Sequence, residues 1–251
     1  MRIEIFDIDG TLTYVHGDIE DKTNFSTYAF WPLITNKFAK DKNALKKMIA
    51  VWEESMKTEQ DQTGSSRRMM QAGIDTFPKD VIGAMIRQCA KEITLQFIEH
   101  DIIRKEAIAY LLSKTQQGIV CILSTGSYQD GAIGFVDALI EKGLLTEQSR
   151  DLLFVTGAMV DWDKKKLTHV NVRERKLVGI EMVMQKRMVD LMPFVKAVYA
   201  DDPWINDRDI LAIAPREKSY VIQTAKNKNK LLPNGYTLIT WKEIIEQSIK
   251  K

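Results

Sequence analysis

The chain has 251 residues, of which 45% are hydrophobic and 28% charged, a composition ordinary for a globular protein and unlike that of a disordered chain. Its 36 Lys and Arg against 34 Asp and Glu give a net charge of +2, which is too balanced for nucleic acid or an anionic membrane as the expected main partner. We find no apolar run near the roughly 18 residues of a membrane span and no signal-peptide pattern, so we expect a cytoplasmic protein.

The first element predicted along the chain is a short strand. Residues 2–7 alternate between apolar and other side chains, and Asp-Ile-Asp-Gly follows as a turn. From about residue 24 to 112, Met, Lys, Ala and Glu recur at helical spacing. Apolar stripes over 44–56 and 81–97 predict two helices, with a polar loop over 60–66 between them. We therefore expect a helical insertion after the first strand.

The second half of the chain predicts strands that alternate with helices. Turns and charged runs separate the elements, and the lysines at 164–166 and 226–230 are expected in exposed loops, whereas Cys121 lies in an apolar run and is expected to be buried. The predicted helices cover 105–114, 131–142 (ended by Gly143), 173–191 and 241–249; the predicted strands are one ending at Ser124, a hairpin of 154–160 with 167–170, and 197–201, 220–223 and 236–240.

Strands separated by helices indicate an α/β protein with a parallel sheet that is covered on both faces. We expect a core formed by residues 1–15 and 100–251 and a helical cap formed by 16–99. In such sheets functional residues gather where the strands end. The expected strand ends carry Asp7, Ser124 and Asp201, and a Lys-bearing helix begins after Val170.

Asp7 and Asp9 are the strongest chemical signal in the sequence. Two carboxylates separated by one residue at a strand end are not easily ionised together without a cation, and they favour a hard, oxygen-ligated metal such as Mg²⁺. An Asp can accept a phosphoryl group when a metal and nearby donors neutralise the incoming phosphate. The alternative is an ordinary Asp-rich turn.

The string Asp-Ile-Asp-Gly-Thr-Leu-Thr from Asp7 resembles the first motif of the haloacid dehalogenase superfamily, especially its phosphoserine-phosphatase-like branch. The resemblance implies a three-layer, Rossmann-like α/β core with a cap inserted after the first strand. It implies Asp7 as the nucleophile and Asp9 as the acid and base. It also implies Mg²⁺ bound by the Asp7 carboxylate and the Asp9 backbone carbonyl, with Thr11 as a supporting residue.

The segment Ile-Leu-Ser-Thr-Gly-Ser that contains Ser124 and Thr125 resembles the second motif, in which a hydroxyl and the amides of a tight turn bind phosphate. The third motif is a Lys, and there are several candidates. Lys176 fits best, because it opens a helix 25 positions before Asp201, whereas Lys164, Lys165, Lys166 and Lys186 fit less well; Arg173 and Arg175 lie close by and leave the choice open.

The fourth, acidic motif resembles the segment around Asp201, with departures. Ala200 stands where the family usually has Gly, and Asp207 comes later than its usual counterpart. Asp201 is the expected third metal ligand beside Asp7 and Asp9. Either Asp202 or Asp207 could complete the motif and orient Lys176, and the sequence leaves that choice open.

These features predict a Mg²⁺-dependent phosphatase that hydrolyses a small phosphorylated metabolite through an aspartyl-phosphate intermediate. Phosphotransfer from the same intermediate, and binding of a phosphorylated ligand or a protein without turnover, are the alternatives. The cap region offers His16, Glu20, Asp21, Arg67 and Arg68 near the expected site, but none of them identifies the substrate. The oligomeric state is also left open.

Overall fold

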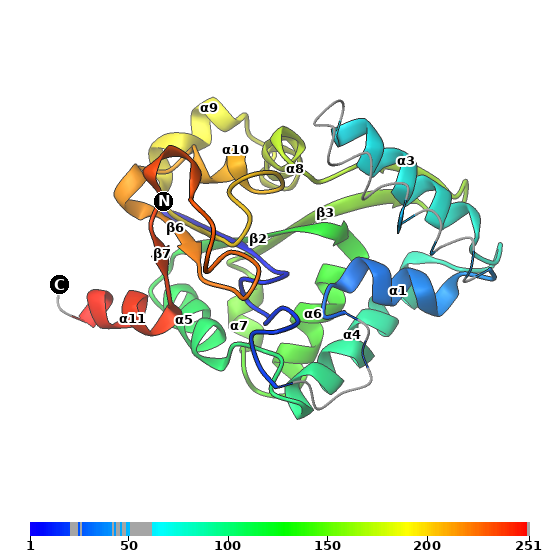
Figure 1. The fold of residues 1–251 in the computed structure, drawn as a ribbon, viewed down its shortest axis with the longest axis horizontal. Helices are drawn as coiled ribbons and strands as arrows, with labels where there is room; N and C mark the ends of the chain where they lie inside the picture. Colours follow the sequence, from blue (N-terminus) through cyan, green and yellow to red (C-terminus); the bar gives the residue numbers. More distant parts are fainter. Residues whose placement is uncertain are drawn as a thin grey trace.

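The computed structural model describes residues 1–20, 25, 27–41, 43, 46, 49–50 and 62–249. Seven strands form one sheet in the order β4-β3-β2-β1-β5-β6-β7, in which the pair β3 and β4 is antiparallel and the other pairs are parallel (Figure 1). The strands are β1 Ile3–Asp7, β2 Val120–Tyr128, β3 Leu153–Asp161, β4 Lys166–His169, β5 Val195–Ala200, β6 Ser219–Ile222 and β7 Leu238–Ile239.

Helices cover both faces of this sheet. In Figure 1, α5, α6 and α11 lie on one side and α8, α9 and α10 on the other. Successive side chains of a strand point to opposite faces, so Phe6 joins the core on the first side and Ile5 the core on the second. The helices are α5 Lys105–Gln116, α6 Gln129–Glu141, α7 Glu147–Arg150, α8 Glu174–Met184, α9 Met188–Leu191, α10 Arg208–Leu211 and α11 Trp241–Ile249, with 3₁₀ turns at Met192–Phe194, Arg216–Lys218 and Pro233–Gly235. The predicted three-layer α/β fold is confirmed.

The segment between β1 and β2 contains α1 Phe30–Phe38, α3 Gln62–Asp75 and α4 Gly83–Glu99. Helix α4 packs closely along α6, where a Cβ on Gly134 would lie 2.1 Å from the Arg87 carbonyl oxygen. Helix α3 is bonded to the β3–β4 hairpin, because Gln71 accepts from the Leu167 N–H at 2.7 Å and donates to the Lys165 carbonyl at 2.9 Å. The inserted helices therefore contact the core at two separate places. The cap boundaries of 16–99 stay a prediction.

Several predicted elements differ from the structure in extent. Strand β2 continues past Ser124 to Tyr128, with an irregular register between these residues where it pairs with β3. The single helix predicted over 173–191 is interrupted after α8, because Gln185 adopts a left-handed conformation with φ of 52°. The loop predicted over 60–66 is helical from Gln62, since tertiary packing buries Ser65 and Ser66 despite their low helix propensity; residues 60 and 61 lie outside the described part.

The remaining sequence predictions concern helices and exposure. Helix α4, Gly83–Glu99, confirms the helix predicted from the apolar stripe over 81–97. The helix predicted over 44–56 falls largely outside the described residues. Cys89 and Cys121 are both buried thiols.

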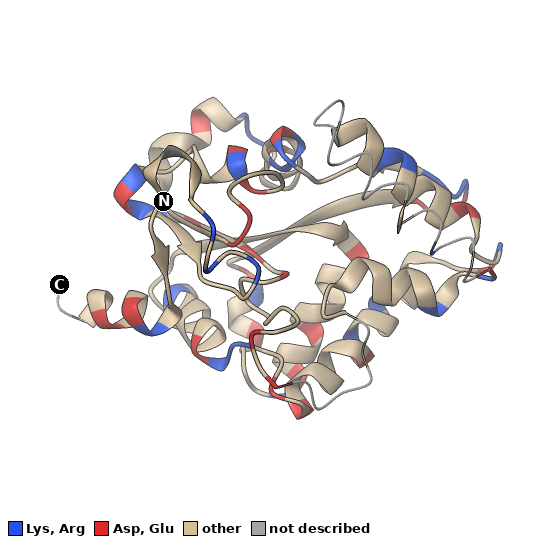
Figure 2. Cartoon of the chain, in the orientation of Figure 1, with Lys and Arg blue, Asp and Glu red and all other residues tan. Residues whose placement is uncertain are grey.

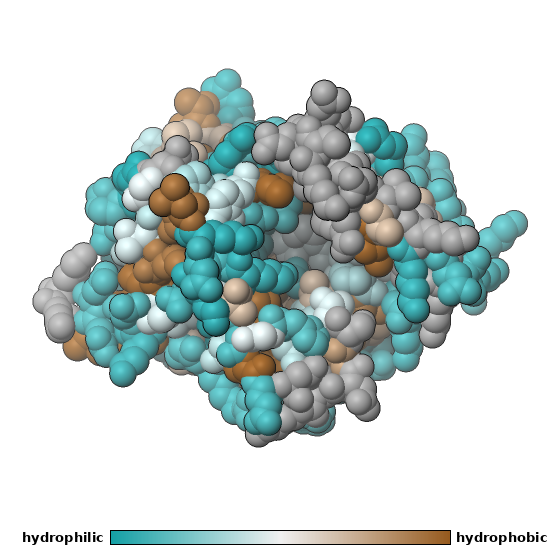
Figure 3. All heavy atoms as spheres, in the orientation of Figure 1, coloured by the Kyte–Doolittle hydropathy of each residue, from teal (hydrophilic) through white to brown (hydrophobic). Residues whose placement is uncertain are grey.

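Charges of both signs are interspersed over the described chain (Figure 2). The described side chains on the face in Figure 3 are mostly hydrophilic, with scattered hydrophobic ones, and this face is hollowed near its centre. The described helices include none with the length and apolar character needed to cross a membrane.

Candidate active site

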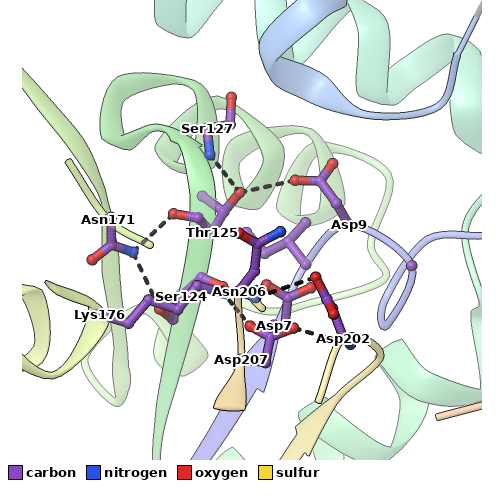
Figure 4. A network of polar contacts seen from close by, with 12 residues as sticks. Asp7, Asp9, Ser124, Thr125, Ser127, Asn171, Lys176, Asp202, Asn206 and Asp207 are labelled. Carbon is purple, nitrogen blue, oxygen red and sulfur yellow. Dashed lines mark hydrogen bonds and ion pairs between the residues drawn. The ribbon is translucent and has the colours of Figure 1, made fainter. Parts of the chain in front are cut away.

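Parallel strands bring the predicted site residues to one edge of the sheet. Asp7 is the last residue of β1 and pairs in register with Ser124 of β2, while Asp201 directly follows β5 on the other side of β1. Because the carboxyl ends of neighbouring parallel strands meet, side chains far apart in the sequence lie together (Figure 4). Asp7 and Ser124 are buried at this edge.

Lys176 occupies the centre of this group. Its ammonium, on a side chain that is only 1% exposed, lies 2.7 Å from Asp7 Oδ1 and 2.5 Å from Asp207 Oδ1, and it reaches the Ser124 carbonyl at 3.5 Å. Burial alone would lower the pKa of Lys176, but the charges of Asp207 and Asp7 outweigh it and hold that pKa above its usual value. Lys176 is thus a permanent cation between two carboxylates.

The two acids that contact Lys176 titrate at unusually high pH. Burial raises the pKa of Asp7 to about 6, an effect that the Lys176 charge opposes and the nearby Asp9 charge reinforces. Burial also raises the pKa of Asp207 to about 7, and the Asp7 carboxylate adds to that shift. Desolvation and neighbouring negative charges both disfavour the ionised carboxylates of Asp7 and Asp207. The single charge of Lys176 therefore does not neutralise these acids.

Oxygen atoms of Asp7, Asp201 and Asp207 lie within 4.8 Å of one another. Asp201 approaches the loop after β1 closely, because Gly10 has a φ of +85° and a Cβ there would lie 2.4 Å from Asp201 Oδ2. The pKa of Asp201 is raised well above its usual range, first by burial and then by the charges of Asp7, Asp207 and Asp202. Among the described residues, Asp201 has no ion pair. These close carboxylate oxygens fit a hard divalent cation such as Mg²⁺.

Asp9 lies at the junction between the sheet edge and the inserted helices. Its Oδ2 accepts from the Thr125 hydroxyl at 2.9 Å, and its Oδ1 accepts from the backbone N–H of Phe30 at the start of α1 at 3.0 Å. Burial raises the pKa of Asp9 above its usual value even though both donors oppose the shift. A carboxyl group with a raised pKa holds a proton more readily and is suited to acid–base chemistry.

The loop after β5 contains the two acids between which the sequence did not decide. Asp202 accepts backbone N–H bonds from the three residues Trp204, Ile205 and Asn206 at 3.3, 3.2 and 3.2 Å, so it stabilises the loop. Asp207, by contrast, pairs with Lys176 through Oδ1 and accepts the Asp202 N–H through Oδ2 at 3.2 Å. The geometry therefore favours Asp207 as the partner of Lys176.

Some predicted residues contact the site less directly. The Thr11 hydroxyl is buried without a hydrogen-bond partner among the described residues. Thr13 stabilises the turn instead, since its hydroxyl accepts from the Gly10 N–H at 3.2 Å. In the inserted region, the Arg67 guanidinium reaches the Leu167 carbonyl at 3.5 Å and Arg68 bonds Ser65 at 3.1 Å.

Other residues named from the sequence lie at the surface or outside the described part. His16 is exposed and stacks on Tyr28, and Glu20 is exposed. Asp21 lies outside the described residues.

Asn171 is a buried site residue that the sequence analysis did not select. It follows β4, is 0% exposed, and donates to the Ser124 hydroxyl oxygen at 3.2 Å and to the Thr125 carbonyl at 2.8 Å (Figure 4). The available signal was weak, because an Asn just after a strand and five residues before Lys176 is equally typical of a turn.

Comparison with known proteins finds similar structures but no match by family model or curated sequence. A protein of unknown function from Bordetella pertussis Tohama I aligns over 96% of this chain and 98% of its own, with a TM-score of 0.59 and 14% identity. Cytosolic 5'-nucleotidase IIIB bound to cytidine aligns over 99% of this chain and 86% of its own, also with a TM-score of 0.59 and 14% identity. At this identity the likeness establishes the fold alone, and the chain shares its three-layer α/β fold with these two proteins.

Proposed function

We propose that this chain is a phosphohydrolase that removes phosphate from a small phosphorylated metabolite, with Asp7 as the phosphoryl acceptor. The observation that carries the proposal is the position of Asp7. Its carboxylate lies at a strand end, 2.7 Å from the buried ammonium of Lys176, and within 4.8 Å of the Asp201 carboxylate. A fixed cation beside a nucleophilic carboxylate attracts the phosphate and also stabilises the charge that develops during transfer.

Mg²⁺ is the proposed cofactor, and the close carboxylate oxygens support it. Asp7 and Asp201 would hold the ion through their carboxylates. The resemblance to the first motif implies the Asp9 backbone carbonyl as a further ligand. When bound, Mg²⁺ supplies positive charge that offsets the repulsion between the phosphate and the acids. Lys176, the Ser124 hydroxyl and Thr125 are the proposed phosphate contacts. Asp207 holds Lys176 in place through the 2.5 Å ion pair.

The proposed reaction has two steps. An Asp7 carboxylate oxygen forms a bond to phosphorus while the bond from phosphorus to the ester oxygen breaks, and Asp9 gives its proton to the departing alkoxide. Asp9, now ionised, takes a proton from water, and that water attacks the aspartyl phosphate to release orthophosphate and restore Asp7. The raised pKa of Asp9, caused by its burial, supports the first role, since the acid must arrive protonated.

The substrate is open within the class of small phosphomonoesters. The similar nucleotidase was solved with cytidine, which makes cytidine monophosphate one reasonable candidate at 14% identity. Phosphoserine and polyol phosphates are further candidates. Transfer to an acceptor alcohol uses the same aspartyl phosphate and differs in the product alone.

The test is orthophosphate release from these esters, with and without Mg²⁺, by wild type, Asp7→Asn and Asp163→Asn. Asp163 is an exposed residue of the hairpin turn and serves as the matched control. We expect Mg²⁺-dependent release by wild type and Asp163→Asn and none by Asp7→Asn. Equal release by Asp7→Asn would refute the covalent mechanism. An absence of release from every ester would favour a binding protein, and a phosphorylated added alcohol would identify a phosphotransferase.

A further inference from the structure

A buried polar cluster lies directly behind the Ser124 hydroxyl. The side-chain nitrogen of Asn171 is 3.2 Å from Ser124 Oγ, 2.8 Å from the Thr125 carbonyl oxygen and 3.4 Å from the Thr156 carbonyl oxygen. Carbonyl oxygens only accept hydrogen bonds, so two of these three neighbours require a donor. The NH₂ group of Asn171 therefore faces them, and the Ser124 oxygen accepts its bond.

The other end of the Asn171 amide confirms this orientation. Its Oδ1 lies 3.3 Å from the Thr156 hydroxyl and 3.3 Å from His169 Nε2. On the opposite side of the imidazole, a guanidinium nitrogen of Arg175 is 3.4 Å from His169 Nδ1. A guanidinium only donates, so Nδ1 is the acceptor and Nε2 carries the hydrogen. Burial, and to a smaller extent the nearby positive charges of Arg175 and Arg67, lower the pKa of His169, which agrees with a neutral ring.

These contacts form a chain in which every donor points the same way. Arg175 donates to His169, His169 to Asn171, and Asn171 to Ser124. A serine hydroxyl has one hydrogen and can accept with its lone pairs. Since Ser124 Oγ accepts from Asn171, its own hydrogen is left to be donated to another acceptor, and Ser124 pairs in register with Asp7.

Helix α8 leaves space for this chain of contacts. A Cβ on Gly179 would lie 2.3 Å from both Asn171 Oδ1 and the Thr156 hydroxyl, and 3.2 Å from His169 Nε2. No side chain fits at that position without displacing the cluster. Gly179 is three residues after Lys176, so both lie on the same side of the helix. The helix that carries Lys176 is thus shaped around the cluster that contacts Ser124.

We infer that Asn171 and His169 are positioning residues that orient the Ser124 hydroxyl, so that its hydrogen is donated to a phosphate oxygen of the ligand. The inference rests on the proposed function, because it takes the ligand beside Asp7 to be a phosphate group. Asn171 acts through Ser124 and His169 acts through Asn171. Neither is inferred to contact the substrate.

The first test is a double-mutant cycle that compares wild type, Asn171→Ala, Ser124→Ala and the double variant. The probe is inorganic phosphate with Mg²⁺, and its Kd is measured by titration calorimetry. Each single substitution should weaken binding about tenfold, the loss expected for one hydrogen bond to an anion. The double variant should bind within about twofold of Ser124→Ala, because Asn171 has nothing to orient without the hydroxyl. Independent effects that multiply to about a hundredfold would overturn the inference.

The second test uses His169 and does not disturb the amide. Gln at this position can accept from Arg175 and donate to Asn171, whereas Leu can do neither. His169→Gln should keep phosphate affinity within about threefold of wild type, and His169→Leu should weaken it about as much as Asn171→Ala. Thermal unfolding checks that the two variants have matched folded fractions. Equal phosphate affinities of the two would contradict the role of His169 in orienting Asn171.

The two proposals fail in different ways in these experiments. If wild type binds inorganic phosphate but hydrolyses no ester, the proposed function is wrong, and the cycle still decides the role of Asn171. If wild type hydrolyses esters and the cycle is additive, the orientation of Ser124 by Asn171 is wrong and the phosphatase stands. Failure of wild type to bind phosphate in the presence of Mg²⁺ overturns the inference.

Discussion

Replacing Lys176 by Met tests whether the ammonium holds the site acids together. Met is similar in length and carries no charge, so the substitution removes the ion pairs with little change in volume. Lys176 is 1% exposed and lies 2.7 Å from Asp7 and 2.5 Å from Asp207. Its pKa is raised above the usual 10.5, so its stabilising contribution is fully present below that pH and is lost only at higher pH. A measurement at pH 7.5 therefore captures the whole contribution.

The expected loss follows from the cost of unpaired buried charge. Removing one partner of a buried ion pair typically lowers the free energy of unfolding by about 3–5 kcal/mol. Here Asp7 and Asp207 lose the same cation. Their pKa values, about 6 and about 7 beside Lys176, rise further without it, so both acids take up protons near neutral pH and the loss is limited. We expect a loss of about 3 kcal/mol, a large part of the roughly 5–15 kcal/mol that stabilises a typical domain.

Urea unfolding followed by tryptophan fluorescence, in EDTA to remove bound cations, measures this loss. Lys166→Met is the matched control, because Lys166 is exposed on β4, and we expect a change within about 0.5 kcal/mol. Adding Asp207→Asn to Lys176→Met should recover part of the loss, since it removes one unpaired carboxylate. A Lys176→Met protein within about 1 kcal/mol of wild type would refute this reasoning.

Three further predictions test other contacts. Asp9→Asn should lower kcat by about 10²–10⁴-fold on alkyl phosphates and less on an aryl phosphate whose leaving group needs no proton; equal losses would contradict the acid role. Burial raises the pKa of Glu4, which accepts from the Tyr199 hydroxyl at 3.0 Å. Because the pKa of Glu4 is raised, the stabilising contribution of this residue is present below pH 4.5 and is lost as pH rises. Wild type should therefore lose stability relative to Glu4→Gln between pH 4.5 and 8. Urea unfolding that shows no such trend would contradict this. Phe30→Pro should have about tenfold lower kcat than Phe30→Ala, because Pro removes the backbone N–H that donates to Asp9. Pro is tolerated at this first helical position, which follows the extended Ala29. Equal kcat values would show that this hydrogen bond is dispensable.

The fold could be predicted from the sequence because apolar residues recur with different periods in its strands and in its helices. Some errors occurred where polar residues continue a regular element, and one where a helix is interrupted. The sequence around Ser124 is typical of a loop, yet β2 extends to Tyr128, since pairing with β3 resumes at Ala158 after an irregular stretch. The interruption at Gln185 was equally invisible, because a non-glycine residue in the left-handed conformation has no reliable sequence signal.

The candidate site could be predicted in part from the sequence, because the parallel sheet determines where its residues lie. Asp7, Ser124 and Asp201 end or follow parallel strands, so their convergence follows from topology. The choice between Asp202 and Asp207 could not follow from it. Both acids belong to one irregular loop, and only the folded backbone shows that one accepts three N–H groups of that loop while the other faces Lys176.

In the proposed mechanism, the contacts of Asp9 make the inserted helices part of the chemistry. One carboxylate oxygen is bonded by Thr125 of the core and the other by Phe30 of α1. Any movement of α1 away from the sheet edge breaks the second bond and leaves the acid held from one side. A carboxyl group that has lost a donor has a higher pKa and a wider range of orientations. Under the proposed mechanism, the position of α1 and the readiness of Asp9 to transfer a proton are therefore coupled. A substrate that draws α1 toward the core would then also hold the bond from the Phe30 N–H that orients Asp9.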